Sequence, residues 1–560
     1  MDAHAPSAAL SHRQVLVVFS GIMLGMLLAA IDQTIVATAL PTIVGDLGGL
    51  DHLSWVVTAY LLAETVSTPL FGKLGDLYGR KRLFQVAICI FVLGSVLSGV
   101  ATSMGQLIAF RAVQGVGAGG LIVLAMALIA DVVSPRERGR YQGYFGAVFG
   151  VASVAGPLLG GFLTDHLSWR WVFYVNVPLG ILALFVTSAV LPRTVRRRQV
   201  RIDWVGTALL SAAIVCLVLL TTWGGTEYDW GSPVIRGLGV AAVVLALGFV
   251  VVERRVAEPA MPLRLFRLRT FTTAAAVSFI VGVAMFGAIT YLPTFLQVAN
   301  GASASNSGLL LVPVMGGMLV ASITAGQIIT RTGRYRRFPI AGMAVTSMAM
   351  LLLSTLDTGS SRWESGAYMA LLGAGIGMVM QILVLAVQNE APVEDLGVAT
   401  STITFFRAVG GSVGVALFGA LFSARLTDLL GAAPTGMTPE QIRALPADEA
   451  ALLAGAFADA ITMVFRYAVP LLVVGFLLTW LLRETALRTT SASARAEAEA
   501  SSTVPVEASI PEDTMAAVSD PAIVVDYGEA PVGRDRDNGA PQSGDASPAE
   551  AVGRANGGER

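Results

Sequence analysis

The chain is poor in charge, in cysteine and in histidine. Only 13% of its 560 residues are charged, against about a quarter in an average soluble protein. Its two cysteines lie in apolar runs, so a disulfide framework and a cysteine-based metal site are excluded. The four histidines show no ligand spacing. A mean hydropathy of +0.70 excludes a disordered chain, and a net charge of −1 indicates no nucleic-acid partner.

Motifs of soluble enzymes are also missing. The sequence holds no phosphate loop ending in Gly-Lys-Ser/Thr, no His-Glu-x-x-His and no nucleophile elbow. Gly115-x-Gly117-x-x-Gly120 has dinucleotide-binding spacing, but it lies inside an apolar run and follows no soluble strand. We therefore expect no enzyme activity, no metal and no cofactor. Energy for any transport would come from an ion gradient or from the substrate's own gradient.

Long apolar runs recur along the chain. A bilayer core about 30 Å thick needs about 20 apolar residues per helix, and these runs lack the polar alternation of barrel strands. The sequence therefore predicts an all-α integral membrane protein with about 14 transmembrane helices. The runs lie near 15–37, 53–73, 83–101, 106–130, 139–163, 169–191, 204–223, 234–252, 271–296, 305–330, 338–356, 364–389, 398–424 and 460–482.

The basic residues favour one orientation. If the N-terminus is cytoplasmic, the inner loops hold most of the arginine and both lysine residues, and basic side chains in inner loops are typical of membrane proteins. We therefore expect both termini in the cytoplasm and a multi-pass protein of the cell membrane. The outer segments hold only Arg170, Arg236, Arg362, Arg425 and Arg443.

A short motif occurs twice and suggests two halves. Gly72-Lys-Leu-Gly-Asp76-Leu-Tyr-Gly79-Arg80 follows the second run, and Gly326-Gln-Ile-Ile-Thr330-Arg-Thr-Gly333-Arg334 follows the tenth. Internal repeats in a membrane chain favour alternating access around a central site; chance recurrence of short turns is the alternative. The domains predicted are a cytoplasmic N-terminus (1–14), a six-helix half (15–191), two inserted helices (204–252), a second six-helix half (271–482) with an outer loop (425–459), and a disordered cytoplasmic tail (486–560).

Several of these stretches resemble one family. Gly72-x-Leu74-x-Asp76-x-x-Gly79-Arg80-Lys81 resembles the signature loop of the major facilitator superfamily. Further matches, over roughly residues 12–485, resemble its fourteen-span drug:proton antiporters; two departures are Leu77, where a basic residue is common, and Ala152, where glycine is usual. The resemblance implies a major facilitator fold of two six-helix halves plus two inserted helices. The further matches are Asp32-Gln-Thr-Ile-Val-Ala-Thr-Ala-Leu-Pro41, Arg111-Ala-Val-Gln-Gly-Val-Gly-Ala-Gly119, Gly156-Pro157-Leu-Leu-Gly160-Gly161 and Trp169-Arg-Trp-Val-Phe-Tyr-Val-Asn-Val-Pro178.

Charges within the apolar runs are candidate functional residues, because a charge in mid-bilayer is costly. Asp32 and Arg111 both fall ~10 Å to the outer side of the midplane by helical rise. We interpret them as a proton-coupling pair, as the family resemblance also implies; a static ion pair between two helices is the alternative. Glu64 lies near the midplane as a second proton site, a cation-attracting wall or a packing residue. Arg407 is a candidate for facing a cavity or an anionic substrate group. Arg466 is expected to pair with Asp459.

Two further motifs concern gating. Asp76 and Arg80 are spaced to pair on one helical turn, and Asp131 ends a span on the same side, so a network of these three is expected. Asp76 could also reach the positive helix end near Gly397 and close a cytoplasmic gate, with Gly72 and Gly79 in the same motif. A simple anchor of basic residues is the alternative. Gly156, Pro157, Gly160 and Gly161 resemble the glycine motif of antiporters; close helix packing without directional meaning is the alternative.

The function expected is proton-coupled export of small amphipathic compounds, cationic or neutral, as in multidrug efflux. The partners expected are the lipid bilayer, a small-molecule substrate and protons, with the chain acting as a monomer. A dedicated exporter of one metabolite, antibiotic, lipid or siderophore is the main alternative. An importer and a non-transporting sensor are less favoured, because Asp32, Arg111 and the Asp76 motif are intact.

Overall fold

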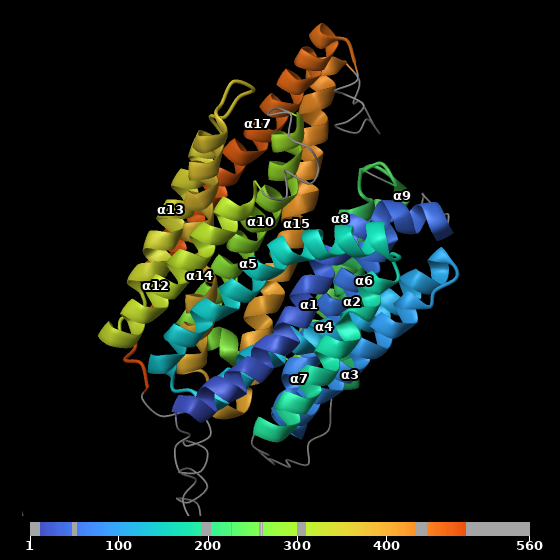
Figure 1. The fold of residues 1–560 in the computed structure, drawn as a ribbon. Helices are drawn as coiled ribbons and strands as arrows, with labels where there is room; N and C mark the ends of the chain where they lie inside the picture. Colours follow the sequence, from blue (N-terminus) through green and yellow to red (C-terminus); the bar gives the residue numbers. More distant parts are fainter. Residues whose placement is uncertain are drawn as a thin grey trace, which may run out of the picture. The chain divides into compact units, whose positions relative to one another are not determined.

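A computed structural model describes residues 12–47, 53–191, 203–225, 227–256, 259, 261–298, 310–431 and 445–488. These residues are helical throughout, apart from short connections (Figure 1). The helices are α1 His12–Leu47, α2 Leu53–Tyr78, α3 Arg80–Gly99, α4 Met104–Val132, α5 Pro135–His166, α6 Trp171–Tyr174, α7 Asn176–Val190, α8 Trp204–Trp223, α9 Pro233–Glu253, η2 Leu263–Arg267, α10 Arg269–Val298, α12 Val312–Thr332, α13 Arg337–Leu353, α14 Arg362–Glu390, η3 Val393–Asp395, α15 Leu396–Leu430 and α17 Ala447–Thr479.

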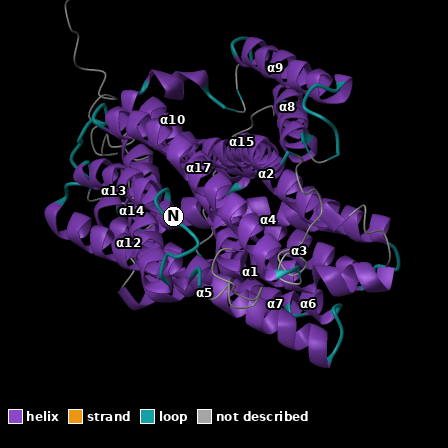
Figure 2. Ribbon diagram, turned by 90° about the horizontal axis from the view of Figure 1, so that it is seen from above, coloured by secondary structure: helices purple, strands orange, loops and turns teal. Residues whose placement is uncertain are grey.

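The helices form two bundles with separate apolar cores. One core is built from α1, α2, α3, α4, α5 and α7, and includes Phe84 and Phe91. The other draws mainly on α10, α12, α13, α14, α15 and α17, and includes Phe418 and Phe465. Helices α8 and α9 pair with one another, and α8 contacts α2 and α15 (Figure 2). We call α1–α7 the N-terminal half and α10–α17 the C-terminal half.

The helices match the predicted spans in number. Eleven of the described helical segments are long and apolar enough to cross a bilayer. Helix α13, with 17 residues, is a shorter apolar helix. Helices α2 and α5 complete the set of expected spans; each carries charged residues, such as Lys73 in α2 and Glu137 in α5. The prediction of an all-α membrane protein is therefore confirmed.

The predicted outer loop at 425–459 is wrong at both ends. Helix α15 continues to Leu430 and ends at Gly431, whose φ of 71° is left-handed. Helix α17 begins at Ala447 with Asp448 and Glu449 in its first turn, where acidic side chains stabilise the positive helix end. Hydropathy falls where these charges begin, but charged residues extend a helix beyond the bilayer without breaking it. The predicted N-terminus up to residue 11 and the tail from residue 489 lie outside the described residues.

The sixth predicted span is broken into α6 and α7. The break falls at Val175, between Tyr174 and Asn176. Pro178 lies in the first turn of α7, where a missing N–H leaves no intrahelical bond unmade. The break places Asn176 at the start of a helix, with its side chain fully buried in the N-terminal half.

Both copies of the repeated motif place a glycine with positive φ in the turn, but the two turns differ, since Gly79 has ψ 125° and Gly333 has ψ 4°. Gly79, between α2 and α3, has φ 95°, and Gly333, after α12, has φ 70°. Only glycine adopts these angles without a steric cost, so both turns require it. The shared positive φ agrees with the sequence repeat of α2 and α12, whereas the difference in ψ means that the two turns are not the same conformation.

Candidate functional site

Asp32 lies at the centre of a buried polar network in the N-terminal half. Its Oδ2 accepts a hydrogen bond from Arg111 Nη1 at 2.5 Å, and its Oδ1 accepts from Gln114 Nε2 at 2.8 Å and from Asn176 Nδ2 at 2.9 Å. Asn176 Nδ2 also donates to Ser95 Oγ at 3.0 Å. Helices α1, α3, α4 and α7 each supply one or more of these groups. The structure thus brings Asp32 and Arg111 together, which their shared depth allowed.

Arg111 is held by more than the carboxylate. Its Nη1 also donates to Gln114 Oε1 at 2.8 Å, and its guanidinium lies over the ring of Tyr60, 4.1 Å from the ring centre. The side chain is 2% exposed, and that of Asp32 is fully buried. A buried ion pair loses more in desolvation than it gains from attraction unless its remaining donors and acceptors are satisfied. Here Gln114, Asn176 and Tyr60 provide that satisfaction.

Close packing of α2 against α4 sets the positions of Tyr60 and Glu64. A methyl group at Gly115 would meet the carbonyl oxygen of Tyr60, and one at Gly119 would meet the carbonyl oxygen of Glu64. Glycine at both positions therefore allows the two helices to approach, as small residues do in membranes. Glu64 accepts a hydrogen bond from Gln33 Nε2 at 2.9 Å. Gln33 thereby connects Glu64 to the helix that carries Asp32.

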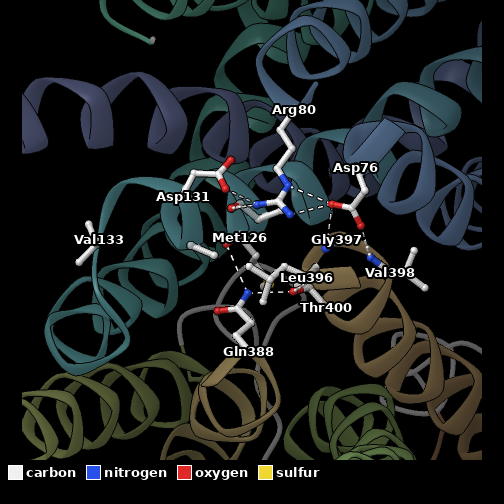
Figure 3. A network of polar contacts seen from close by, with 12 residues as sticks. Asp76, Arg80, Met126, Asp131, Val133, Gln388, Leu396, Gly397, Val398 and Thr400 are labelled. Atoms are coloured by element: carbon white, nitrogen blue, oxygen red, sulfur yellow. Dashed lines mark hydrogen bonds and ion pairs between the residues drawn. The ribbon is translucent and has the colours of Figure 1, made fainter. Parts of the chain in front are cut away.

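A second polar network joins the two halves at the ends of α2 and α15 (Figure 3). Asp76 Oδ1 accepts from Arg80 Nη2 at 2.7 Å and from the backbone N–H of Gly397 at 3.1 Å. Its Oδ2 accepts from the N–H of Val398 at 3.0 Å. Arg80 Nη1 donates to Asp131 Oδ1 at 2.5 Å. We call Asp76, Arg80, Asp131 and the first turn of α15 the latch.

The first turn of α15 takes its cap from the other half. Helices α4, α5, α8, α9 and α14 begin after a serine or aspartate that accepts a hydrogen bond from the helix's own first turn. Asp395 stands at this position in α15 but makes no such bond, and it instead accepts from Arg264 Nη2 at 3.0 Å. The N–H groups of Gly397 and Val398 are satisfied by Asp76 of α2.

The equivalent crossing in the repeat works differently. Thr330 of α12 occupies the position that Asp76 has in α2, and its carbonyl accepts from Arg136 Nε at 3.3 Å. The neighbouring helix α5 has its own capping box, in which Ser134 and Glu137 bond one another. Only one of the two crossings therefore depends on an acidic side chain from the opposite half.

A further contact between the halves, which the sequence did not reveal, involves Arg138. Arg138 Nη1 donates to Gln388 Oε1 of α14 at 2.7 Å. Gln388 Nε2 in turn donates to Thr400 Oγ1 of α15 at 2.8 Å (Figure 3). Arg138 also bonds the carbonyl groups that end α4. The sequence signal for this contact was the position of Arg138, four residues after the capping Ser134. Gln114 and Asn176 were likewise within quoted motifs, but had been given no role.

The glycine motif of α5 packs against α1 near Asp32. A methyl group at Gly156 would lie 3.2 Å from the backbone nitrogen of Ile35 and closer still to Thr34. Thr34 Oγ1 donates to the carbonyl of Ala152 at 2.9 Å. Gly161 has open space around it. Close approach of α1 and α5 thus accounts for one glycine of this motif. The motif's other members are Pro157 and Gly160.

Among the described residues of the C-terminal half, Arg466 does not have its predicted partner, and Arg407 has none. Asp459 pairs with Arg425 Nε of α15 at 2.8 Å, so the predicted pair of Asp459 with Arg466 is wrong. Arg466 lies two turns away along α17, about 10 Å by helical rise, whereas α15 runs alongside. Arg407 of α15 is 9% exposed. No hydrogen bond or ion pair to Arg407 is present in the described part of the chain.

Residues 22–415 match the family described as Major Facilitator Superfamily. The chain belongs to this superfamily, and the predicted fold class is confirmed. It is a membrane transporter. An uncharacterized MFS-type transporter of Mycobacterium tuberculosis is 48% identical over 480 residues, covering 84% of this chain and 70% of that protein. The multidrug transporter protein MdtP of Bacillus subtilis is 41% identical over 411 residues, covering 73% and 76%.

A solved structure supports the fold. The proton:xylose symporter XylE aligns with a TM-score of 0.60 at 14% identity, over 87% of this chain and all of that one (100%). At this identity the similarity concerns the fold alone. Multi-pass membrane location and a small-molecule substrate follow from the family and the apolar helices.

Proposed function

We propose that this transporter exports small amphipathic compounds, cationic or neutral, in exchange for protons, and that it belongs to the fourteen-span drug:proton antiporters. Similarity to a bacterial multidrug transporter supports the drug-efflux class. The proposed setting is the cell membrane, with both termini cytoplasmic and the chain working as a monomer.

The observation that carries the proposal is the bonding of Asp32. Its two oxygens face three N–H donors, from Arg111, Gln114 and Asn176, and they receive all three bonds in a fully buried site. A carboxylate offers about four acceptor sites, and a proton on Asp32 takes the fourth and removes the negative charge that holds Arg111. Gain and loss of the proton therefore change the strength of the contacts that join α1, α4 and α7, which is what coupling requires.

Glu64 is the proposed attraction point for a cationic substrate. It is held by one amide donor, Gln33, whereas Asp32 is held by three. A carboxylate with free acceptor capacity can bind an ammonium group or a proton. Because Gln33 is adjacent to Asp32 on α1, a ligand that displaces Gln33 acts on the helix that holds the proposed proton site.

The latch is the proposed gate on the cytoplasmic side. In alternating access a transporter closes one side while the other opens. Here the halves are joined at the ends of α2 and α15 by the bonds of Asp76, and nearby by Arg138 and Gln388. Opening this end must break these bonds. None of them belongs to the network around Asp32.

The test measures substrate-induced proton release in everted vesicles, with Asp32→Asn as the variant. We expect release to stop, because the variant has no carboxylate to deprotonate. Asp46→Asn is the matched control. Asp46 lies on the same helix as Asp32, but it pairs with Arg170, which is far from Asp32 in the sequence. Unchanged gradient-driven transport by Asp32→Asn would leave only the static ion-pair role.

Loss of folding must be separated from loss of coupling. Removing one partner of a buried ion pair costs about 3–5 kcal/mol, because the other charge stays buried and unpaired. The double variant Asp32→Asn with Arg111→Gln removes both charges and avoids that cost. If the double variant folds and still exchanges protons for substrate, Asp32 is not the proton carrier.

Substrate breadth decides between the two export functions. A panel of toxic compounds is applied to a pump-deficient host that expresses the chain. Resistance to several unrelated amphipathic compounds supports drug efflux, whereas resistance to one compound alone identifies a dedicated exporter.

A further inference from the structure

We propose that Arg407 and Gln381 form a subsite for an anionic group of the substrate, so that the transporter accepts amphoteric compounds carrying both a cation and a carboxylate. This rests on the proposed function, in which Glu64 attracts the cationic group. The subsite lies in the C-terminal half, across from Glu64 in the N-terminal half.

Arg407 and Gln381 are both buried, and the part of the chain that the structure describes offers no partner to Arg407 or to Gln381 Oε1. Arg407 is 9% exposed and Gln381 is 7% exposed. Within the described residues, Arg407 makes no hydrogen bond or ion pair, and Gln381 Oε1 has no hydrogen-bond partner. A buried unpaired guanidinium is costly in a membrane protein, and intramembrane charges usually serve function. The deeply buried Arg111, by contrast, has a carboxylate, an amide and an aromatic ring.

Helical register places the two residues at one level. Gln388 of α14 bonds Thr400 of α15 near the latch, and from there the two helices run away from the latch in opposite chain directions. Gln381 and Arg407 each lie about two turns, or ~10 Å, farther from the latch than this bonded pair. Each also shares a helix face with the member of the pair on its own helix.

Near the latch, the α14 member of this pair reaches the N-terminal half. Gln388 accepts from Arg138 of α5, and its Nε2 lies 3.5 Å from the carbonyl of Met126 in α4. Helical rise also gives the distance of Glu64 from the latch. Glu64 lies about 18 Å along α2 from Asp76, and Arg407 lies about 15 Å along α15 from Gly397, which Asp76 bonds. An acidic group of one half and an unpaired basic group of the other are therefore at similar distances from the closed latch.

The chemistry of these groups defines the ligand. Arg407 offers up to five N–H donors in a planar arrangement that suits a carboxylate, and lysine would not reproduce it. Gln381 Oε1 is a free acceptor for an N–H or O–H next to that carboxylate. Glu64 binds the cationic group. A compound with a delocalised cation and a carboxylate on one aromatic framework meets these conditions and is neutral overall.

The experiment compares two dyes that differ by one methyl ester. Rhodamine 110 carries a carboxylate on a cationic ring system, and rhodamine 123 is its methyl ester. Binding to the purified full chain in detergent is followed by fluorescence anisotropy. We expect the wild type to bind the acid about tenfold or more tightly than the ester, the range for a hydrogen bond to a charged group.

Arg407→Gln should weaken binding of the acid to the level of the ester and leave the ester unchanged. Arg407→Lys should recover only part of the preference. Arg466→Gln is the matched control, because Arg466 is an exposed arginine of a membrane helix in the same half. It should keep the full preference.

Two results would overturn the inference. One is a wild type that binds the acid no more tightly than the ester. The other is an Arg407→Gln variant whose binding of acid and ester weakens equally, as a purely structural role of Arg407 predicts. If Arg407→Gln does not fold, the acid–ester comparison on the wild type and on Arg407→Lys decides. Acid preference without proton exchange in vesicles would refute the proposed function alone, and proton exchange without acid preference would refute this inference alone.

Discussion

Removing the side chain of Asp76 should open the latch. In Asp76→Ala the N–H groups of Gly397 and Val398 lose the carboxylate that bonds them at 3.1 and 3.0 Å. The bond of Asp76 to Arg80 lies within one half, so it is available whether the latch is closed or open. Only the two bonds to α15 bias the conformation.

The size of the effect follows from these two bonds. A hydrogen bond to a charged group contributes about 1.5–3 kcal/mol, and part of this is recovered when water reaches the open helix end. A net bias of about 2–4 kcal/mol is expected, which changes the ratio of closed to open molecules roughly 30- to 1,000-fold. Asp76→Asn keeps one acceptor oxygen and should give about half of this free energy.

The measurement is a distance distribution between two spin labels across the latch. Labels at Arg82→Cys and Arg331→Cys, both exposed near this end, are placed in a chain with Cys89 and Cys216 replaced by serine. The fraction of long distances should rise from wild type to Asp76→Asn to Asp76→Ala.

The control is Glu137→Gln, because Glu137 belongs to a capping box within one half. It should leave the distance distribution unchanged. The reasoning is refuted if Asp76→Ala stays as fully closed as the wild type, or if Glu137→Gln opens the latch equally.

Two further outcomes are expected. Gly72→Ala should slow transport and shift the same spin-label distances toward open, because a methyl group there would lie 2.9 Å from the carbonyl oxygen of Gly397; Gly316→Ala, with open space around it, should do neither. Hydrogen bonds from Trp169 and Arg170 lower the pKa of Asp46, so its stabilising effect is complete above the ordinary pKa of about 4 and is lost as pH falls through the lowered value. Thermal melts of Asp46→Asn and wild type should therefore differ at pH 6 and converge in strong acid; a difference that persists at low pH would contradict this.

Much of the fold was accessible from the sequence because bilayer thickness and loop charge constrain it strongly. Helix ends were less accessible. Hydropathy marks where a helix leaves the hydrocarbon, and α15 and α17 continue beyond that point. The break between α6 and α7 was also missed, since Asn176 and Pro178 interrupt an apolar run too briefly to divide it.

Parts of the candidate site could be anticipated, and others could not. Helical rise put Asp32 and Arg111 at one depth, and the structure shows them bonded. The roles of Gln114 and Asn176 depend on which helix faces meet, and rotation about a helix axis is not fixed in an apolar sequence. The pairing of Asp459 with Arg425 was missed for the same reason, because proximity along one helix was preferred to contact between two.

The arrangement of α2 and α4 constrains how a proton could move the latch. Arg111 and Asp131 are on α4, and Glu64 and Asp76 are on α2, so each helix connects the proposed proton site to the latch. Glycines at 115 and 119 pack the two helices so closely that sliding between them would drive backbone atoms together. The two helices must then move as one unit. With Asp32 as the proposed proton site, we expect its protonation to act on the latch by tilting the N-terminal half as a whole, and this tilt would break the bonds from Asp76 to α15.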